Sequence, residues 1–112
     1  MDDPTPGKKV TAYRLTPAMA TKRIRALAAR TDDIDWSNHA LERMEEREIF
    51  DVDVVRTMRG GEIAGEPEPA RLGEWKCKFV RQVRGGRSVG VVVIILQNNR
   101  LLVKTVEWED LT

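Results

Sequence analysis

The first half of the chain carries apolar residues at helical spacing, with a capping signal before each group. Thr16-Pro17 is typical of a helix start, because a hydroxyl caps the first turn and proline is tolerated at the first helical position. The segment after it, to about Arg30, is rich in Ala, Leu, Arg and Lys and predicts a helix. Two further helices are predicted in the same way: residues 38–48, capped by Ser37, and a short helix capped by Asp51 and ended by Gly60-Gly61.

Beyond Gly61 the spacing of apolar residues changes from helical to extended. Trp75, Cys77 and Phe79 alternate with lysines, which is the pattern of a half-buried strand. The run Ser88–Leu96 is almost entirely aliphatic and β-branched, as in a well-covered central strand. The other extended elements are an edge strand at Glu62–Glu66 closed by Pro67 and Pro69, tight turns at Gly85-Gly86 and Asn98-Asn99, and a last strand at Leu101–Trp108.

This order of elements predicts an α+β fold, with two or three N-terminal helices packed on a three- to four-stranded antiparallel meander sheet. Residues 13–112 would form a single domain. Residues 1–12 contain prolines and little apolar content, and we expect them to be a flexible tail. The acidic stretch Asp32–Asp35 is expected to be a connector between the first two helices.

The composition, 41% hydrophobic and 33% charged, fits a soluble globular protein. The longest apolar run, Val89–Leu96, is far shorter than the roughly 20 residues that cross a bilayer. The N-terminus lacks the apolar segment of a secretory signal, and the single cysteine, Cys77, excludes an internal disulfide. We therefore expect a cytoplasmic protein that does not bind membranes.

The formal net charge of +1 conceals an uneven distribution of charge. The two ends of the sequence are basic, whereas residues 31–75 carry five Lys or Arg against thirteen Asp or Glu. A nucleic acid would therefore bind to a local patch and not to the whole surface. Ordinary mixed-sign surface charge is the alternative interpretation.

The segment His39–Arg47 contains the candidate catalytic residues. In a helix, residues four apart lie about 40° apart around the axis, so His39, Arg43 and Arg47 would form one ridge beside the apolar face. A titratable imidazole next to two permanent cations is suited to acid–base chemistry on a phosphate ester. Alternatively, the ridge is a solvated helix face whose arginines pair with Glu42 or Glu46.

The predicted strands supply possible RNA- and phosphate-binding residues: Lys76, Lys78, Lys104 and Trp108. Side chains on one face of adjacent strands stand about 5 Å apart, so the lysines could converge on a phosphate. Trp108 could stack an RNA base or pack in the core, and lysines are also ordinary on the solvated side of a sheet. The sequence has no Cys/His cluster and no Gly-rich loop opening a helix, so we expect no metal and no cofactor.

From Ser37 onwards the chain resembles a family of small bacterial domains of unknown function. The resemblance rests on four motifs: His39-Ala40-Leu41-Glu42-Arg43-Met44-Glu45-Glu46-Arg47, Asp53-Val54-Val55 with the following segment to Gly60, Leu72-Gly73-Glu74-Trp75-Lys76, and Thr105-Val106-Glu107-Trp108. That family in turn resembles the RelE-like toxin ribonucleases in having helices followed by a meander.

The resemblance implies a metal-independent endoribonuclease that acts on mRNA or tRNA and is paired with an antitoxin protein. His39 would be the general acid or base, and Arg43 and Arg47 would neutralise the phosphate. Lys76 and Lys78 would assist from the sheet. Two alternatives stay open: a non-catalytic module that binds RNA or protein, and a domain whose exposed strand edge pairs with another chain.

Overall fold

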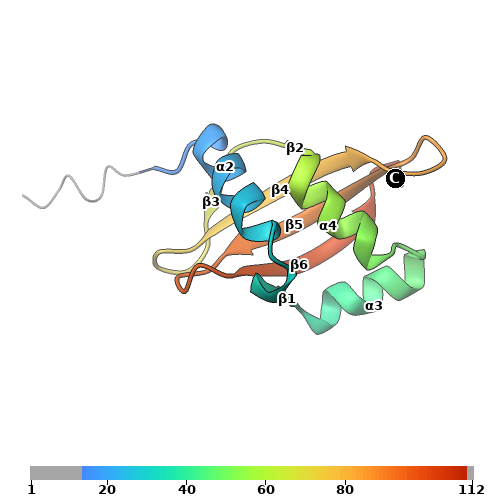
Figure 1. The fold of residues 1–112 in the computed structure, drawn as a ribbon, viewed down its shortest axis with the longest axis horizontal. Helices are drawn as coiled ribbons and strands as arrows, with labels where there is room; N and C mark the ends of the chain where they lie inside the picture. The colour runs from blue at the N-terminus through green and yellow to red at the C-terminus, as the bar shows by residue number, and fades with distance from the viewer. Residues whose placement is uncertain (1–13, 111–112) are drawn as a thin grey trace, which may run out of the picture.

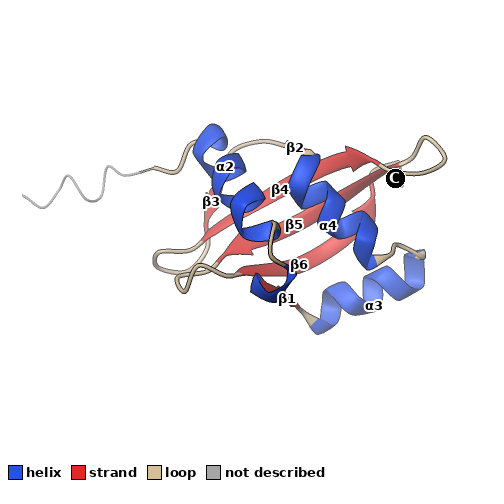
Figure 2. Cartoon of the chain, in the orientation of Figure 1, coloured by secondary structure: helices blue, strands red, loops and turns tan. Residues whose placement is uncertain are grey.

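The computed structural model describes residues 14–110, so the tail predicted at residues 1–12 lies outside the described residues. The elements are, in chain order, α2 (Pro17–Ala28), η1 (Thr31–Asp33), β1 (Ile34–Trp36), α3 (Asn38–Arg47), α4 (Asp51–Gly60), β2 (Glu62–Ile63), β3 (Glu68–Pro69), β4 (Trp75–Gln82), β5 (Ser88–Ile95) and β6 (Leu101–Trp108). Figures 1 and 2 show α2 and α4 lying across one face of a twisted sheet, with α3 beside its β6 edge. The α+β class and the three helices expected from the sequence are confirmed.

The sheet is mixed and has six strands, in the order β1-β6-β5-β4-β2, with β3 also paired to β4. β4, β5 and β6 form an antiparallel meander, but the expectation of a purely antiparallel sheet of three or four strands is wrong. The connector expected at Asp32–Asp35 ends in β1, which pairs in parallel with Leu101–Val103 of β6. A strand of three residues is too short to show an alternating pattern in the sequence.

The helices begin where the sequence provides capping oxygens. The Thr16 hydroxyl accepts a hydrogen bond from Met19 N at 3.1 Å, which caps α2. The prediction that Asp51 caps α4 is wrong, because Asp51 is the first residue of the helix and Phe50 is at the N-cap position. Instead Asp53, one turn into the helix, accepts from Phe50 N at 3.0 Å through its carboxylate. α3 ends at Arg47, and the C-cap residue Glu48 adopts a left-handed backbone conformation (φ 56°) without being glycine.

The edge strand expected at Glu62–Glu66 is replaced by two shorter strands. β2 and β3 each contribute two residues, and both pair with β4. Pro69 therefore lies within a strand and does not close one. Proline is tolerated there because an edge strand uses only part of its backbone donors.

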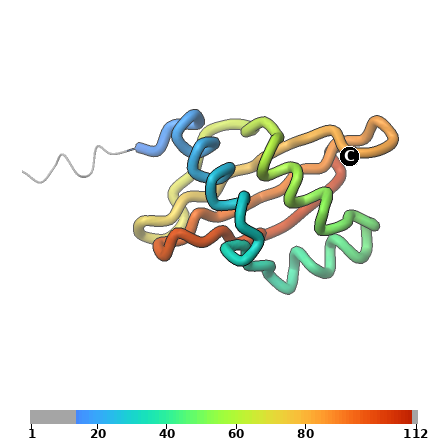
Figure 3. Tube along the Cα trace, in the orientation of Figure 1, coloured from blue at the N-terminus to red at the C-terminus, as the bar shows by residue number. Residues whose placement is uncertain are grey.

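A single core lies between the sheet and the two helices on its face, whose path Figure 3 traces. Val89, Val91 and Val93 of β5 are fully buried there, while Val92 and Ile94 on the other side of β5 are only half-buried. β5 is thus central but covered by helices on one side only. We call the other, helix-free side of the sheet the open face. Within residues 14–110, no helix has the length and apolar character needed to cross a membrane.

Candidate functional site

α3 starts directly after β1 and lies along the part of β6 that β1 leaves unpaired. Ser37 N donates to the Val103 carbonyl at 3.1 Å, and the Ser37 hydroxyl donates to the Lys104 carbonyl at 2.9 Å. The same hydroxyl oxygen accepts from Ala40 N at 3.0 Å and so caps the helix. One serine therefore attaches the beginning of α3, including His39, to β6 at Lys104.

The three candidate residues of α3 differ in their surroundings. His39 is exposed, whereas Arg43 and Arg47 are half-buried. Arg43 Nη1 lies 2.7 Å from Glu46 Oε1, so its charge is paired within the helix. An exposed pair of this kind is worth at most about 1 kcal/mol, so a phosphate could displace the carboxylate.

The two lysines of β4 on the open face are both paired with carboxylates. Lys78 Nζ lies 3.0 Å from Glu109 Oε2 and 3.3 Å from Glu107 Oε2. These two carboxylates, Glu109 more than Glu107, raise the pKa of Lys78 above its usual value. Lys76 Nζ lies 3.6 Å from Glu68 Oε1. Much of the positive charge of β4 is therefore balanced within the protein.

Lys104 of β6 is differently placed. Val92 pairs with Thr105 and Val93 with Val103, so Lys104 is the extra residue of a β-bulge. Bulges redirect side chains and are over-represented next to active sites. Lys104 is exposed and forms no ion pair with any residue between 14 and 110. It is the lysine of the predicted set that is available to bind an anion.

Trp108 is not positioned to stack a base, as one interpretation of the sequence required. It is 5% exposed, and its Nε1 donates to the Arg47 carbonyl at 2.8 Å. The Arg87 guanidinium carbon lies 4.0 Å from its ring centroid and that of Arg84 5.5 Å away. Trp108 therefore ties the end of β6 to the end of α3, in agreement with the alternative that it belongs to the core.

The predicted residues form two groups and not one. The Ser37 hydroxyl joins the start of α3 to the backbone of Lys104. Lys76 and Lys78 lie on β4, which is two strand spacings, or about 10 Å, from β6, and α3 lies beyond β6. In the described part of the chain, one cleft contains Lys76 and Lys78 and another contains Lys104, and neither has a lining residue from α3.

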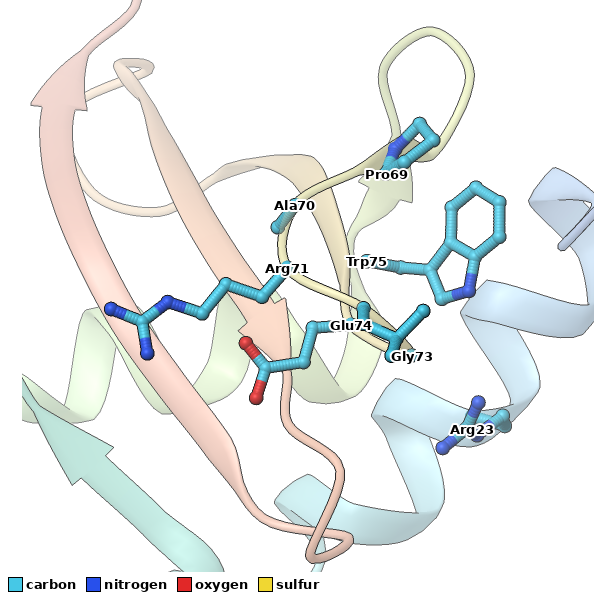
Figure 4. Close-up of a pocket in the computed structure, with 8 residues that line it drawn as sticks. Arg23, Pro69, Ala70, Arg71, Gly73, Glu74 and Trp75 are labelled. Carbon is cyan, nitrogen blue, oxygen red and sulfur yellow. The ribbon is translucent and has the colours of Figure 1, made fainter.

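The sequence interpretation missed a cleft of about 340 Å³ on the open face beside Lys104. Its lining residues are Ala70, Arg71, Glu74, Ile94, Leu96, Leu102 and Lys104. Figure 4 shows Arg71 and Glu74 extending to the same side of their loop, away from Trp75 and Arg23. The motif Leu72-Gly73-Glu74-Trp75-Lys76 was the available signal, but no local pattern reveals which strands this loop covers.

Neither a reactive thiol nor a metal cluster is found among the described residues. Cys77 is buried, and burial raises its pKa to about 11, so the thiol is unreactive near neutral pH. Among residues 14–110, no group of three or more His, Cys, Asp or Glu side chains lies close enough to hold a metal ion. The candidate site consists of the open-face cleft and the start of α3, because they contain Lys104 and His39.

No curated protein and no solved structure matches this chain. A family model matches residues 36–108, from the end of β1 to the end of β6. The match includes α3, the strands of the open face and the loop that carries Arg71 and Glu74, and it leaves α2 outside. The chain accordingly belongs to the family of domains of unknown function DUF4258.

Proposed function

We propose that this domain is a toxin-like endoribonuclease that cleaves mRNA or tRNA without a metal ion. The observation that carries the proposal is the open face, where Lys104 and Arg71 are exposed and have no ion-pair partner within residues 14–110. Unpaired cations on an uncovered sheet face are suited to RNA phosphates. Helices on one side of an antiparallel meander are also the layout of the RelE-like toxins. The proposal assigns the protein to the cytoplasm, where those RNAs are found.

In the proposed reaction, the ribose 2′-oxygen attacks the adjacent phosphorus and the 5′-oxygen of the next nucleotide leaves. His39 acts as general base or acid: it takes the proton of the 2′-hydroxyl or delivers one to the leaving oxygen, and water makes the other transfer. Such catalysis contributes about 10²–10⁴-fold. Arg43 and Arg47 neutralise the phosphate, together with Lys104 from the adjoining bulge. Lys76 and Lys78 assist from the sheet only by exchanging the carboxylates of Glu68, Glu107 and Glu109 for RNA phosphates.

Cleavage of a single-stranded RNA in the presence of EDTA tests this proposal. The variants are His39→Ala, Arg43→Ala and Lys104→Ala, and Asn38→Ala, an exposed neighbour on α3, is the matched control. We expect His39→Ala to lose at least about 100-fold in rate and Asn38→Ala to be unchanged. Equal rates in all variants would remove these residues from the mechanism.

The second candidate function is a non-catalytic module that binds RNA or an antitoxin protein. It is favoured by half-buried apolar side chains on the open face, such as Val92, Ile94 and Leu102, and by the pairing of Lys78 with carboxylates. A partner chain could cover this apolar strip. Salt-dependent binding of RNA that stays intact would support this function over the nuclease.

A further inference from the structure

The loop that carries Arg71 and Glu74 is fixed to the turn between β5 and β6. Gln97 donates from its side-chain amide to the Leu72 carbonyl, and Glu74 Oε2 accepts from Gln97 N at 3.4 Å. Gly73 adopts φ +78°, and a Cβ there would lie 3.3 Å from Gln97 Cγ. Glycine thus allows both the turn and the close approach. These contacts hold Arg71 and Glu74 over the end of the open face.

The cleft beneath this loop combines an apolar floor with both signs of charge. Ile94 and Leu102 are cross-strand partners in β5 and β6, and with Leu96 they form the floor. Arg71 and Lys104 are its cations, and Glu74 supplies the carboxylate acceptor among the lining side chains. A volume of about 340 Å³ lies within the usual range for small-ligand sites.

These features define the chemistry of a ligand. The two cations attract phosphate, but the Glu74 carboxylate repels it and accepts hydrogen bonds from N–H groups. The apolar floor suits a flat ring. A matching ligand therefore carries an anionic backbone next to a planar ring that presents N–H donors, as a nucleotide does.

We propose that this cleft binds one unpaired guanine of a single-stranded RNA. Glu74 accepts from the N1–H and N2–H groups on the Watson–Crick edge of guanine, and Arg71 and Lys104 bind the flanking phosphates. Cytosine and adenine each offer a single amino group on that edge. Uracil offers one N–H between two carbonyl oxygens that the carboxylate repels. The assignment rests on the proposed function, because it names the base at which the RNA is held.

Fluorescence anisotropy tests the proposal with four five-nucleotide RNA probes that differ only in the central base. The probes are UUGUU, UUAUU, UUCUU and UUUUU, each 2′-O-methylated so that the 2′-oxygen cannot attack. The proteins are the wild type, Glu74→Gln, Lys104→Ala and Glu62→Gln. The last variant makes the same charge change as Glu74→Gln at an exposed residue of β2, which β4 separates from the β5–β6 floor of the cleft.

We expect the wild type and Glu62→Gln to prefer UUGUU by about tenfold. Glu74→Gln keeps a side-chain oxygen that can accept from Gln97 N. This variant is expected to bind all four probes equally, with the affinity that the wild type has for UUUUU. Lys104→Ala is expected to weaken all four probes by a similar factor. Equal binding of the four probes by the wild type would overturn the guanine assignment and leave the proposed RNA function standing. Failure to bind any of the probes would overturn both.

Discussion

Gly60 and Gly61 end α4, and alanine is expected to have different effects at the two positions. At Gly61 a Cβ would lie 2.6 Å from the Thr57 carbonyl oxygen and 2.7 Å from the Val80 carbonyl oxygen. Both are backbone atoms, one in α4 and the other in β4, so neither can rotate away as a side chain would. Overpacking typically costs about 1–3 kcal/mol, and two backbone clashes place Gly61→Ala near the upper value.

Gly60→Ala is the matched control for this prediction. The nearest atom to a Cβ at Gly60 is Arg81 Nε at 3.9 Å, which is an ordinary contact. Alanine also loses less backbone entropy on folding than glycine. The Gly60→Ala variant is therefore expected to be unchanged or more stable by about 0.5 kcal/mol.

Urea unfolding followed by fluorescence of Trp36, Trp75 and Trp108 measures the free energy of unfolding of each variant. For a domain of this size, a loss of about 3 kcal/mol corresponds to a fall in Tm of about 12–24 °C. If Gly61→Ala unfolds within about 0.5 kcal/mol of the wild type, the close approach of α4 to β4 is refuted.

Three further predictions concern charged and nucleophilic groups. Arg84→Ala is expected to destabilise the fold by about 2 kcal/mol in urea unfolding, because Arg84 Nη2 lies 3.0 Å from the carboxylate of buried Asp53; a loss below about 0.5 kcal/mol would contradict this. The pKa of Asp35 is held below its usual value, chiefly by hydrogen bonds from Arg100, so the unfolded chain takes up a proton first as the pH falls. The stability from this pair is present above about pH 4 and lost below it, and Asp35→Asn is expected to flatten the acid limb of the stability curve. Cys77 is expected to react with iodoacetamide at least about 100-fold faster in urea than in the native protein, and mass spectrometry measures both rates.

Helical spacing in the sequence predicts which residues of α3 share a face, but only the fold determines which residues of the sheet lie near them. The ridge of His39, Arg43 and Arg47 follows from helical spacing alone. The distance of this ridge from Lys76 and Lys78 cannot be predicted from helical spacing, because it depends on β5 and β6 lying between β4 and α3. The ion pairs of Lys78 with Glu107 and Glu109 also arise from strand pairing, since Glu107 lies 29 positions after Lys78 along the chain. The nuclease proposal therefore relies on Lys104 more than the sequence suggested.

Much of the fold could be predicted from the sequence because the responsible forces are local. Thr16 and Ser37 cap helices at the expected positions, and the tight turn at Asn98-Asn99 has Asn99 at φ 63°. Alternation in β4 and the aliphatic run in β5 reflect which side of each strand is buried. Capping, turn geometry and the alternation of buried side chains each act over a few residues, so they leave a readable pattern.

The tertiary structure alone decided how distant segments combine. β1 is too short to be recognised, and it exists because β6 offers it a partner. The loop that carries Arg71 and Glu74 forms a cleft because Gln97, in the turn between β5 and β6, donates a hydrogen bond to the Leu72 carbonyl of this loop. Trp108 is withdrawn from the surface because the Arg47 carbonyl accepts its N–H. Such contacts join residues far apart in the chain, and their free energy depends on the folded arrangement, so the sequence determined the elements and the packing determined the site.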